Sequence, residues 1–168
     1  MTPFQTFIIP DAPPFPNSQL PVIFYPGAFQ AAALSEISSV IAERFSENNW
    51  PDAWQNGIYP FDHFHAQAHE VLGCARGWVK VQLGGPDGIP FQFKAGDVVL
   101  LPAGVAHRRL DSSADYLIIG SYPAGQTSDL KRGEPAAYQA AKDAIAQVPL
   151  PENDPVMGAN GAVQQVWY

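Results

Sequence analysis

The chain has 168 residues, 46% of them hydrophobic, which is enough apolar surface for one folded domain and argues against a disordered protein. Nine basic side chains against sixteen acidic ones give a formal net charge of −7, and no basic run exceeds two residues. Nucleic acid and anionic membrane surfaces are therefore not expected as partners. No apolar run approaches the roughly 20 residues of a membrane span, the N-terminus lacks a signal-peptide pattern, and a single cysteine permits no intramolecular disulfide, so we expect a cytoplasmic protein.

The first 54 residues are expected to form an extension of a strand and a helix. Residues 20–26, LPVIFYP, predict a short strand, which the prolines at both ends limit to an edge or terminal position. Apolar residues recur at helical spacing between residues 28 and 46, which predicts an amphipathic helix. These residues are Phe29, Ala33, Ile37, Val40, Ile41 and Phe45.

Residues 55–123 have the pattern of a β domain. Short segments rich in β-branched and aromatic residues are separated by glycines, and VKVQL and FQFK alternate apolar with polar residues as half-buried strands do. No helical pattern lies between them, so we predict an antiparallel sandwich or barrel.

Residues 124–168 are expected to be a C-terminal loop, helix and tail. Pro135 suits the first turn of a helix within residues 133–148, and AVQQVWY at the end is a possible last strand. Because the predicted helices flank the β core at both ends, we assign residues 1–168 to a single domain.

The stretch HFHAQAHE, residues 63–70, contains three of the four histidines. On a helix, His65 and His69 would share a face, as in zinc metalloproteases, but the glutamate that acts as general base there is absent. On a strand, His63 and His65 would share a face, with Glu70 and the distant His107 as further candidates. Such a nitrogen and oxygen ligand set suits six-coordinate Mn, Fe, Ni or Co, or Zn. The remaining alternative is that these histidines are ordinary hydrogen-bonded polar groups.

The spacing of these residues resembles the two motifs of the cupin superfamily. The first motif is matched by Gly57, His63, His65, Glu70 and Gly77, with every spacing met. The second is matched by Gly96, Pro102, Gly104 and His107, followed by Asp111 where the family usually has asparagine. The resemblance is to small single-domain bacterial cupins of unassigned activity.

The resemblance implies an all-β core, an antiparallel β-barrel or jelly roll with flanking N- and C-terminal helices. It also implies that His63, His65, Glu70 and His107 bind one divalent transition metal ion, Fe, Mn, Ni, Co or Zn. His69 would face away and take no part. Asp111 is not at a ligand position, so its presence in place of the usual asparagine concerns the geometry of the local turn and not metal binding.

Strand alternation selects the neighbours of such a site. Tyr59 and Phe61 would face inward with the paired histidines, and Cys74 with Glu70, where a small buried filler is its simplest role. Arg109 would face inward with His107. It would then contact a substrate carboxylate or other oxyanion, or instead form an ion pair at the rim with a nearby aspartate, Asp111 or Asp115.

Two classes of function fit these features. The first is a metal-dependent enzyme acting on a small molecule, of dioxygenase, isomerase or decarboxylase type. The second is a non-catalytic metal-dependent module that binds or senses a small molecule. The resemblance further implies a homodimer, for which LPVIFYP and AVQQVWY are candidate interface segments.

Overall fold

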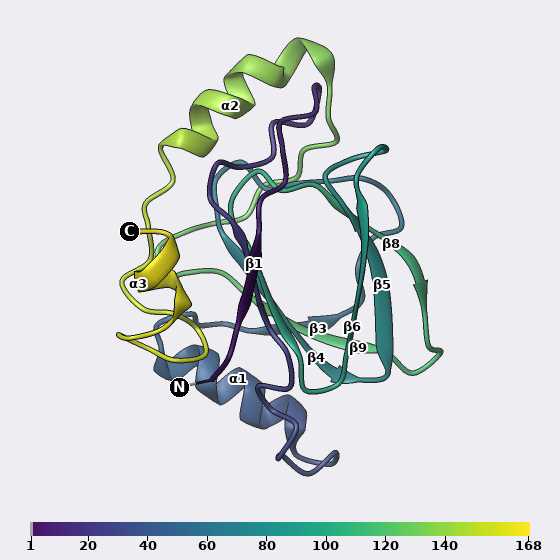
Figure 1. Ribbon diagram of the computed structural model, residues 1–168, viewed down its shortest axis with the longest axis vertical. Helices are drawn as coiled ribbons and strands as arrows, with labels where there is room; N and C mark the ends of the chain where they lie inside the picture. The colour runs from purple at the N-terminus through teal and green to yellow at the C-terminus, as the bar shows by residue number, and fades with distance from the viewer. Residues whose placement is uncertain (1) are drawn as a thin grey trace.

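Two antiparallel sheets packed face to face form the core of the protein (Figure 1). The computed structural model describes residues 2–168. The larger sheet has, in spatial order, β1 (Gln5–Phe7), β2 (Val22–Tyr25), β7 (Val98–Leu101), β4 (Glu70–Arg76), β9 (Leu117–Ser121) and β3 (Trp54–Asn56). The smaller sheet has β6 (Ile89–Lys94), β5 (Trp78–Leu83) and β8 (His107–Ser112). The predicted all-β antiparallel core is confirmed. Its form is an open sandwich of two sheets rather than a closed barrel.

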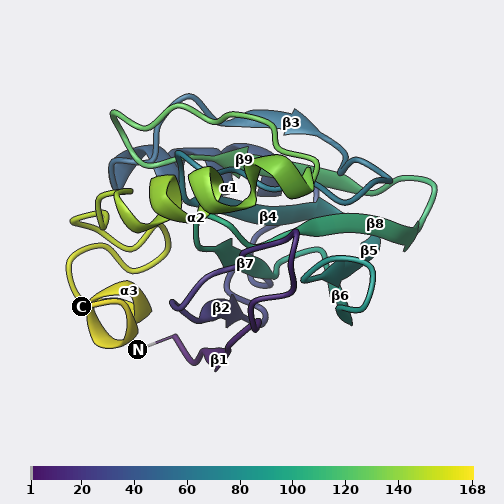
Figure 2. The same cartoon turned by 90° about the horizontal axis from the view of Figure 1, so that it is seen from above.

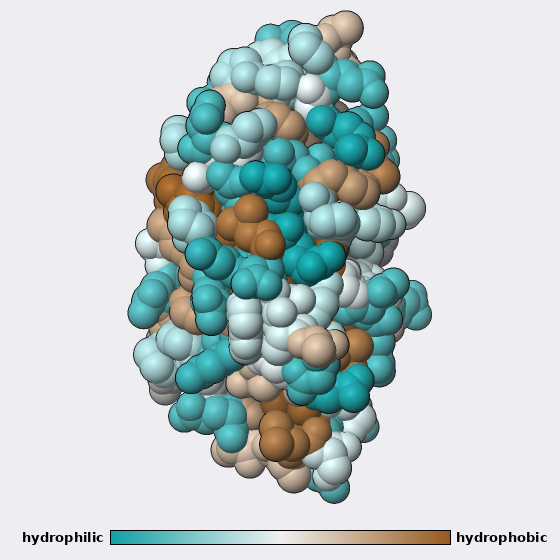
Figure 3. All heavy atoms as spheres, turned by 90° about the vertical axis from the view of Figure 1, so that its right-hand side faces the viewer, coloured by the Kyte–Doolittle hydropathy of each residue, from teal (hydrophilic) through white to brown (hydrophobic). Residues whose placement is uncertain are grey.

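Burial along the strands follows from what covers each sheet. Every residue of β7 is buried, as are the first six residues of β4, because both faces of the larger sheet are covered. The outer face of the smaller sheet is exposed to solvent, so β5 alternates buried Val79, Val81 and Leu83 with more exposed residues. Figure 3 looks onto the side of the molecule that carries this sheet, and its surface is mainly hydrophilic with apolar residues in separate small groups.

Helices cover the outer face of the larger sheet. The helix α1 (Ile37–Glu47) buries Ile37, Ile41 and Phe45 against it, and α3 (Ala162–Val166) packs into the same apolar cluster. The helix α2 (Tyr138–Ala146) follows a short 3₁₀ turn, Pro135–Ala137, and lies at one end of the sandwich (Figures 1 and 2). The predicted flanking helices are confirmed, although Pro135 begins the 3₁₀ turn before α2 and lies outside α2 itself.

Two N-terminal predictions need correction. The segment LPVIFYP is not an edge strand, because β2 pairs with β1 on one side and with β7 on the other; its prolines lie just outside the paired residues. The predicted helix over residues 28–46 is helical only from Ile37. Residues 26–31 form turns, in which the Phe29 amide donates to the Gly96 carbonyl at 2.8 Å, although the Phe29 side chain is still buried.

The predicted last strand is wrong, because AVQQVWY contains the helix α3. The first amides of this helix are satisfied by distant side chains: the Ala162 amide donates to the Tyr25 hydroxyl at 2.9 Å and the Val163 amide to Asp154 Oδ2 at 3.2 Å. The residue pattern of a short sequence segment cannot predict hydrogen-bond partners that are distant in the chain. The single-domain assignment, with its divisions at residues 54 and 123, stays a prediction.

Candidate metal centre

The fold brings the two histidine motifs together through the main chain. His63 and His107 form an antiparallel bridge, in which the His63 amide donates to the His107 carbonyl at 3.2 Å and the reverse bond is 2.9 Å. The Gly104 amide donates to the His65 carbonyl at 2.8 Å. Gly104 has a φ of +101°, a conformation that glycine adopts without strain. One candidate metal-binding nitrogen from each of His63, His65 and His107 lies within 4.8 Å of the others.

All three rings have the same hydrogen-bond arrangement. Nδ1 of His63 lies 3.0 Å from the Phe61 carbonyl, Nδ1 of His107 lies 3.0 Å from the Val105 carbonyl, and Nδ1 of His65 contacts the Asp129 carbonyl. A carbonyl oxygen only accepts, so each Nδ1 carries the proton and each Nε2 of a neutral ring keeps a lone pair. This is the arrangement in which histidines bind metals.

Glu70, the first residue of β4, supplies a carboxylate to the same point. Its Oε1 atom lies 3.4 Å from Nε2 of His65 and 3.3 Å from Nε2 of His107, and it is buried without a hydrogen-bond partner of good geometry. A cation among these four side chains would satisfy that oxygen. The donor set therefore fits a divalent transition metal, with three imidazoles and one carboxylate as ligands.

The pKa shifts indicate that the buried Glu70 carboxylate is stabilised by a positive charge beside it. Burial lowers the pKa of His63 to about 3, assisted by the neighbouring His107. Burial also disfavours charge on His65, but Glu70 and Asp129 outweigh it and raise the pKa of His65 to about 9. Burial would raise the pKa of Glu70, yet His65 and His107 hold it well below its usual range. A metal cation would supply to Glu70 the positive charge that the His65 proton supplies in the chain alone.

A cavity of about 400 Å³ opens beside the cluster. Its lining combines the four candidate ligands with aromatic and polar groups: Trp54, Asn56, Gly57, Ile58, Tyr59, Pro60, His63, His65, Glu70, Leu72, His107, Tyr116 and Tyr122. Tyr59, which is 54% exposed, marks where the cavity meets the surface. A small molecule entering here would reach the histidine cluster.

The four predicted pocket residues take different positions. Tyr59 lines the cavity, whereas Phe61 stacks on Tyr59 with 4.8 Å between ring centroids and is covered by the Arg132 guanidinium, 3.7 Å from its ring centroid. Cys74 is fully buried in the apolar core between the sheets, and burial raises its pKa to about 12. Phe61 and Cys74 are not among the lining residues.

Arg109 faces the inside of the sandwich but stops short of the cavity. It pairs in register with the buried Val81, and its guanidinium lies over the ring of Tyr116, 5.9 Å from the centroid. A bulge in β8 turns Asp111 to the other side, where it pairs with Lys80. Among the described residues, neither Asp111 nor Asp115 forms an ion pair with Arg109.

His69 is buried but is not part of the cluster. Its Nδ1 accepts a hydrogen bond from the Ala103 amide at 2.9 Å, and its ring packs against Trp167 with 4.9 Å between centroids. Burial lowers its pKa to about 4, so it is neutral near pH 7. Its ring faces away from the cluster as predicted, because Trp167 belongs to the apolar cluster on the outer face of the larger sheet.

Several residues of the site gave no sequence signal. Tyr122 follows β9 and lines the cavity with its ring centroid 5.7 Å from that of His65; burial and the Glu70 charge raise its pKa to about 12. Tyr116 accepts the Ile58 amide at 3.1 Å, and a side chain at Gly57 would meet its hydroxyl at 2.3 Å, which gives the first motif glycine a packing reason. These positions depend on pairings between distant segments.

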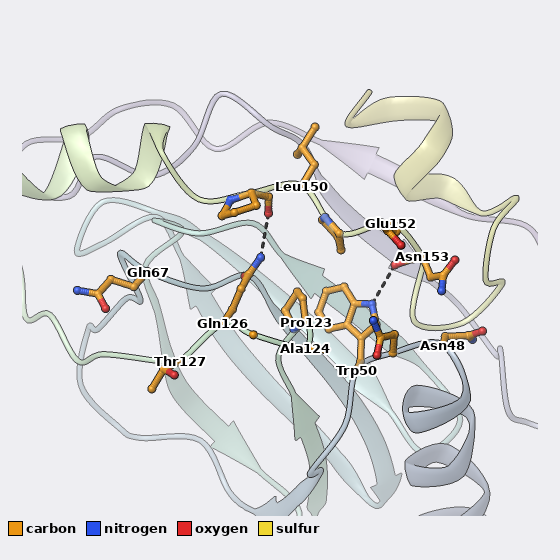
Figure 4. Close-up of a pocket in the computed structure, with 14 residues that line it drawn as sticks. Asn48, Trp50, Gln67, Pro123, Ala124, Gln126, Thr127, Leu150, Glu152 and Asn153 are labelled. Atoms are coloured by element: carbon orange, nitrogen blue, oxygen red, sulfur yellow. Dashed lines mark hydrogen bonds between the residues drawn. The ribbon is translucent and has the colours of Figure 1, made fainter.

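A second cavity, of about 510 Å³, lies between residues 48–50, 123–127 and 149–153 (Figure 4). Neutral amides and prolines dominate its lining, and Glu152 is the only charged residue there. Gln126 donates to the Pro149 carbonyl and Trp50 to the Asn153 carbonyl, both at 2.9 Å. Without a histidine or a group of titratable side chains, it offers less chemistry than the smaller cavity.

Two antiparallel sheets bring together three histidines and a glutamate from the two motifs, which is the arrangement that the resemblance to cupins implies. The chain belongs to the family of "Uncharacterized protein YjlB" from Bacillus subtilis (strain 168), with 35% identity over 164 residues that cover 97% of this chain and 96% of that protein. No family model matches the chain.

More distant structural likenesses involve part of the chain. The QdtA 3,4-ketoisomerase from Thermoanaerobacterium thermosaccharolyticum matches 56% of this chain and 74% of its own, with 19% identity and a TM-score of 0.45. A DUF861 family protein from Thermotoga maritima matches 48% and 85%, with 22% identity and a TM-score of 0.34. Procruciferin, an 11S globulin from Brassica napus, matches 48% of this chain but only 22% of its own, with 16% identity and a TM-score of 0.40. Likenesses this distant carry no functional argument.

Within residues 2–168, none of the helices has the length and apolar character needed to cross a membrane.

Proposed function

We propose that the protein binds one divalent transition metal ion through His63, His65, Glu70 and His107 and acts on a small molecule in the adjacent cavity. One observation carries the proposal: three rings, each with Nδ1 held by a backbone carbonyl, converge with a buried carboxylate oxygen that has no hydrogen-bond partner of good geometry. A bound ion of Fe, Mn, Ni, Co or Zn would supply Lewis-acid or O₂-dependent chemistry.

The charges of the site favour an anionic ligand. Three neutral imidazoles and one carboxylate leave one positive charge of a divalent ion uncompensated in a buried place, which attracts a carboxylate or another oxyanion. The ligand does not need Arg109 for this, since that guanidinium lies behind Tyr116. The Arg109 charge would attract the ligand only through the intervening Tyr116 ring.

The chain's own residues would orient the ligand and limit water. Trp54, Tyr116 and Tyr122 form aromatic walls beside the cluster. With a pKa raised to about 12 by burial and by the Glu70 carboxylate, the Tyr122 phenol keeps its proton at neutral pH and directs it toward Glu70. Nε1 of Trp54 is buried beside the Tyr122 phenol, without a hydrogen-bond partner of good geometry.

The test begins with metal content. Protein expressed under defined supply of each metal would be analysed by mass spectrometry of the elements, beside the variants His63→Ala and His107→Ala, with His69→Gln as a matched control from the same stretch. We expect about one metal per chain in the wild type and the control, and loss from both alanine variants. Full occupancy in both alanine variants would refute the ligand set.

A second experiment separates catalysis from binding alone. Metal-loaded and chelator-treated protein would be screened against carboxylates and sugar acids by thermal shift, followed by product analysis of each compound that stabilises the loaded form. Turnover identifies an enzyme, whereas stabilisation without turnover favours the binding or sensing module. Stabilisation of the chelator-treated form alone would contradict the proposal.

We also propose a cytoplasmic homodimer. Because β2 is paired on both sides and residues 162–166 are helical, neither predicted interface segment offers a free strand edge. Among the described strands, the free edges are those of β1 and β3 in the larger sheet and of β6 in the smaller one, since the outer edge of β8 bonds to Tyr59 and His63. Light scattering tests the dimer, and a monomer at micromolar concentration would contradict it.

A further inference from the structure

The first metal motif is held by a segment that lies outside both motifs. Residues 126–131, here called the clamp segment, follow β9 and bond to the chain between Phe64 and His69. Lys131 and Phe64 exchange two backbone hydrogen bonds of 3.0 Å, and Gln126 Oε1 accepts the His69 amide at 3.0 Å. The loop HFHAQAHE therefore takes its shape from residues roughly sixty positions further along the chain.

Asp129 makes the central contacts of the clamp segment. Its Oδ1 atom accepts the amides of Ala66 at 2.9 Å and Gln67 at 3.0 Å, and its backbone carbonyl accepts Nδ1–H of His65. One residue thus holds both the His65 ring and the turn that follows it. Its Oδ2 atom is buried without a hydrogen-bond partner. The cost of that burial is offset by the bonds of the other carboxylate oxygen and by attraction to the nearby His65 ring.

His65 needs this support more than the other two histidines do. Nδ1 of His63 and Nδ1 of His107 bond to carbonyls two residues earlier in their own segments, and the two backbones are bridged to each other. His65 belongs to no strand or bridge, and the partner of its Nδ1 is 64 residues away. The direction of its Nε2 therefore depends on where Asp129 lies.

We infer that Asp129 is a positioning residue for His65, and that through it the clamp segment controls one corner of the metal site. The inference rests on the proposed metal binding. Partners that orient a ligating histidine typically change metal affinity 10- to 100-fold when they are removed. Loss of Asp129 should disturb His65 alone, because Nδ1 of His63 and Nδ1 of His107 bond to carbonyls in their own segments.

The first test compares Asp129→Ala with Asp129→Asn. Asparagine keeps an oxygen that can accept the Ala66 and Gln67 amides, whereas alanine keeps none. Asp143→Ala, which removes an exposed carboxylate from α2, is the matched control. Affinity would be measured by competition with a chelator, and coordination by the visible absorption spectrum of the Co²⁺-loaded protein. We expect Asp129→Ala to bind 10- to 100-fold more weakly with an altered Co²⁺ spectrum, Asp129→Asn to stay within a few fold of the wild type, and the control to be unchanged.

The second test needs no metal, so it separates this inference from the proposed function. Long-range ¹H–¹⁵N spectra of the imidazoles in metal-free protein report which ring nitrogen carries the proton. Asp129→Ala should move the His65 signals and leave those of His63 and His107 in place. If the wild type binds no metal but this selective change appears, the proposed function fails and the positioning role stands. Unmoved His65 signals, or unchanged metal affinity in Asp129→Ala, would overturn the inference.

Discussion

Replacing His69 by glutamine should remove a specific part of the acid sensitivity of this protein while leaving metal binding intact. His69 lies in the histidine-rich loop, 2% exposed, and its Nδ1 accepts the Ala103 amide at 2.9 Å. Glutamine also offers an acceptor oxygen but does not titrate. Some packing against Trp167 will be lost, so the variant should be less stable at every pH.

The magnitude follows from the pKa of His69, which burial lowers to about 4, partly offset by the Pro149 carbonyl. In the unfolded chain the imidazole titrates near its usual pKa of about 6.5. Because the folded pKa is the lower one, the stabilising effect is complete above pH 6.5 and is lost as the pH falls toward 4. At pH 5 the unfolded chain has taken up a proton that the native protein has not, which lowers the free energy of unfolding by about 2 kcal/mol.

Urea unfolding of chelator-treated protein at several pH values between 7.5 and 5 measures this difference. The wild type should lose about 2 kcal/mol more than His69→Gln over that range. His63, whose pKa burial lowers to about 3, contributes with the same sign but is present in both proteins, so it cancels in the comparison. Parallel pH profiles would refute the reasoning, because they would mean that His69 is not held neutral in the native protein.

Three further substitutions test the structure around the site. Gly120→Ala would place a methyl group 2.0 Å from the Trp54 ring, so we expect a loss of about 1–3 kcal/mol and a lower urea midpoint; an unchanged midpoint would contradict this packing. Asp154→Ala leaves the buried Tyr25 hydroxyl and the Val163 amide of α3 without an acceptor, and should lower the thermal midpoint through a loss of about 3 kcal/mol or more. A loss below about 1 kcal/mol would speak against that network. Arg109→Ala should keep its metal affinity, because the guanidinium contacts Tyr116 and does not line the cavity; released metal in the purified variant would show that Arg109 supports the site.

Local pattern was sufficient for much of the fold. The alternation in β5 and β6 and the apolar face of α1 come from residues that are adjacent or one turn apart, and such periodicity survives without knowledge of the partner. It failed at α3, whose first amides bond to Tyr25 and Asp154, and at β2, whose second partner lies some 75 residues away. Contacts between residues so far apart in the sequence cannot be predicted from the pattern of a short segment.

The metal site likewise has some features that the local sequence predicts and others that depend on the tertiary structure. The sequence by itself determined the candidate ligands, because their identity and spacing are chemical facts of two short motifs, and it separated His69 from them by strand alternation. Only the tertiary structure decided that Tyr122 lines the cavity, that Arg109 stops behind Tyr116, and that Asp129 holds His65. The physical reason is that a ligand set needs residue types at a fixed spacing, whereas the walls and supports of the site are set by contacts between segments that the chain separates by tens of residues.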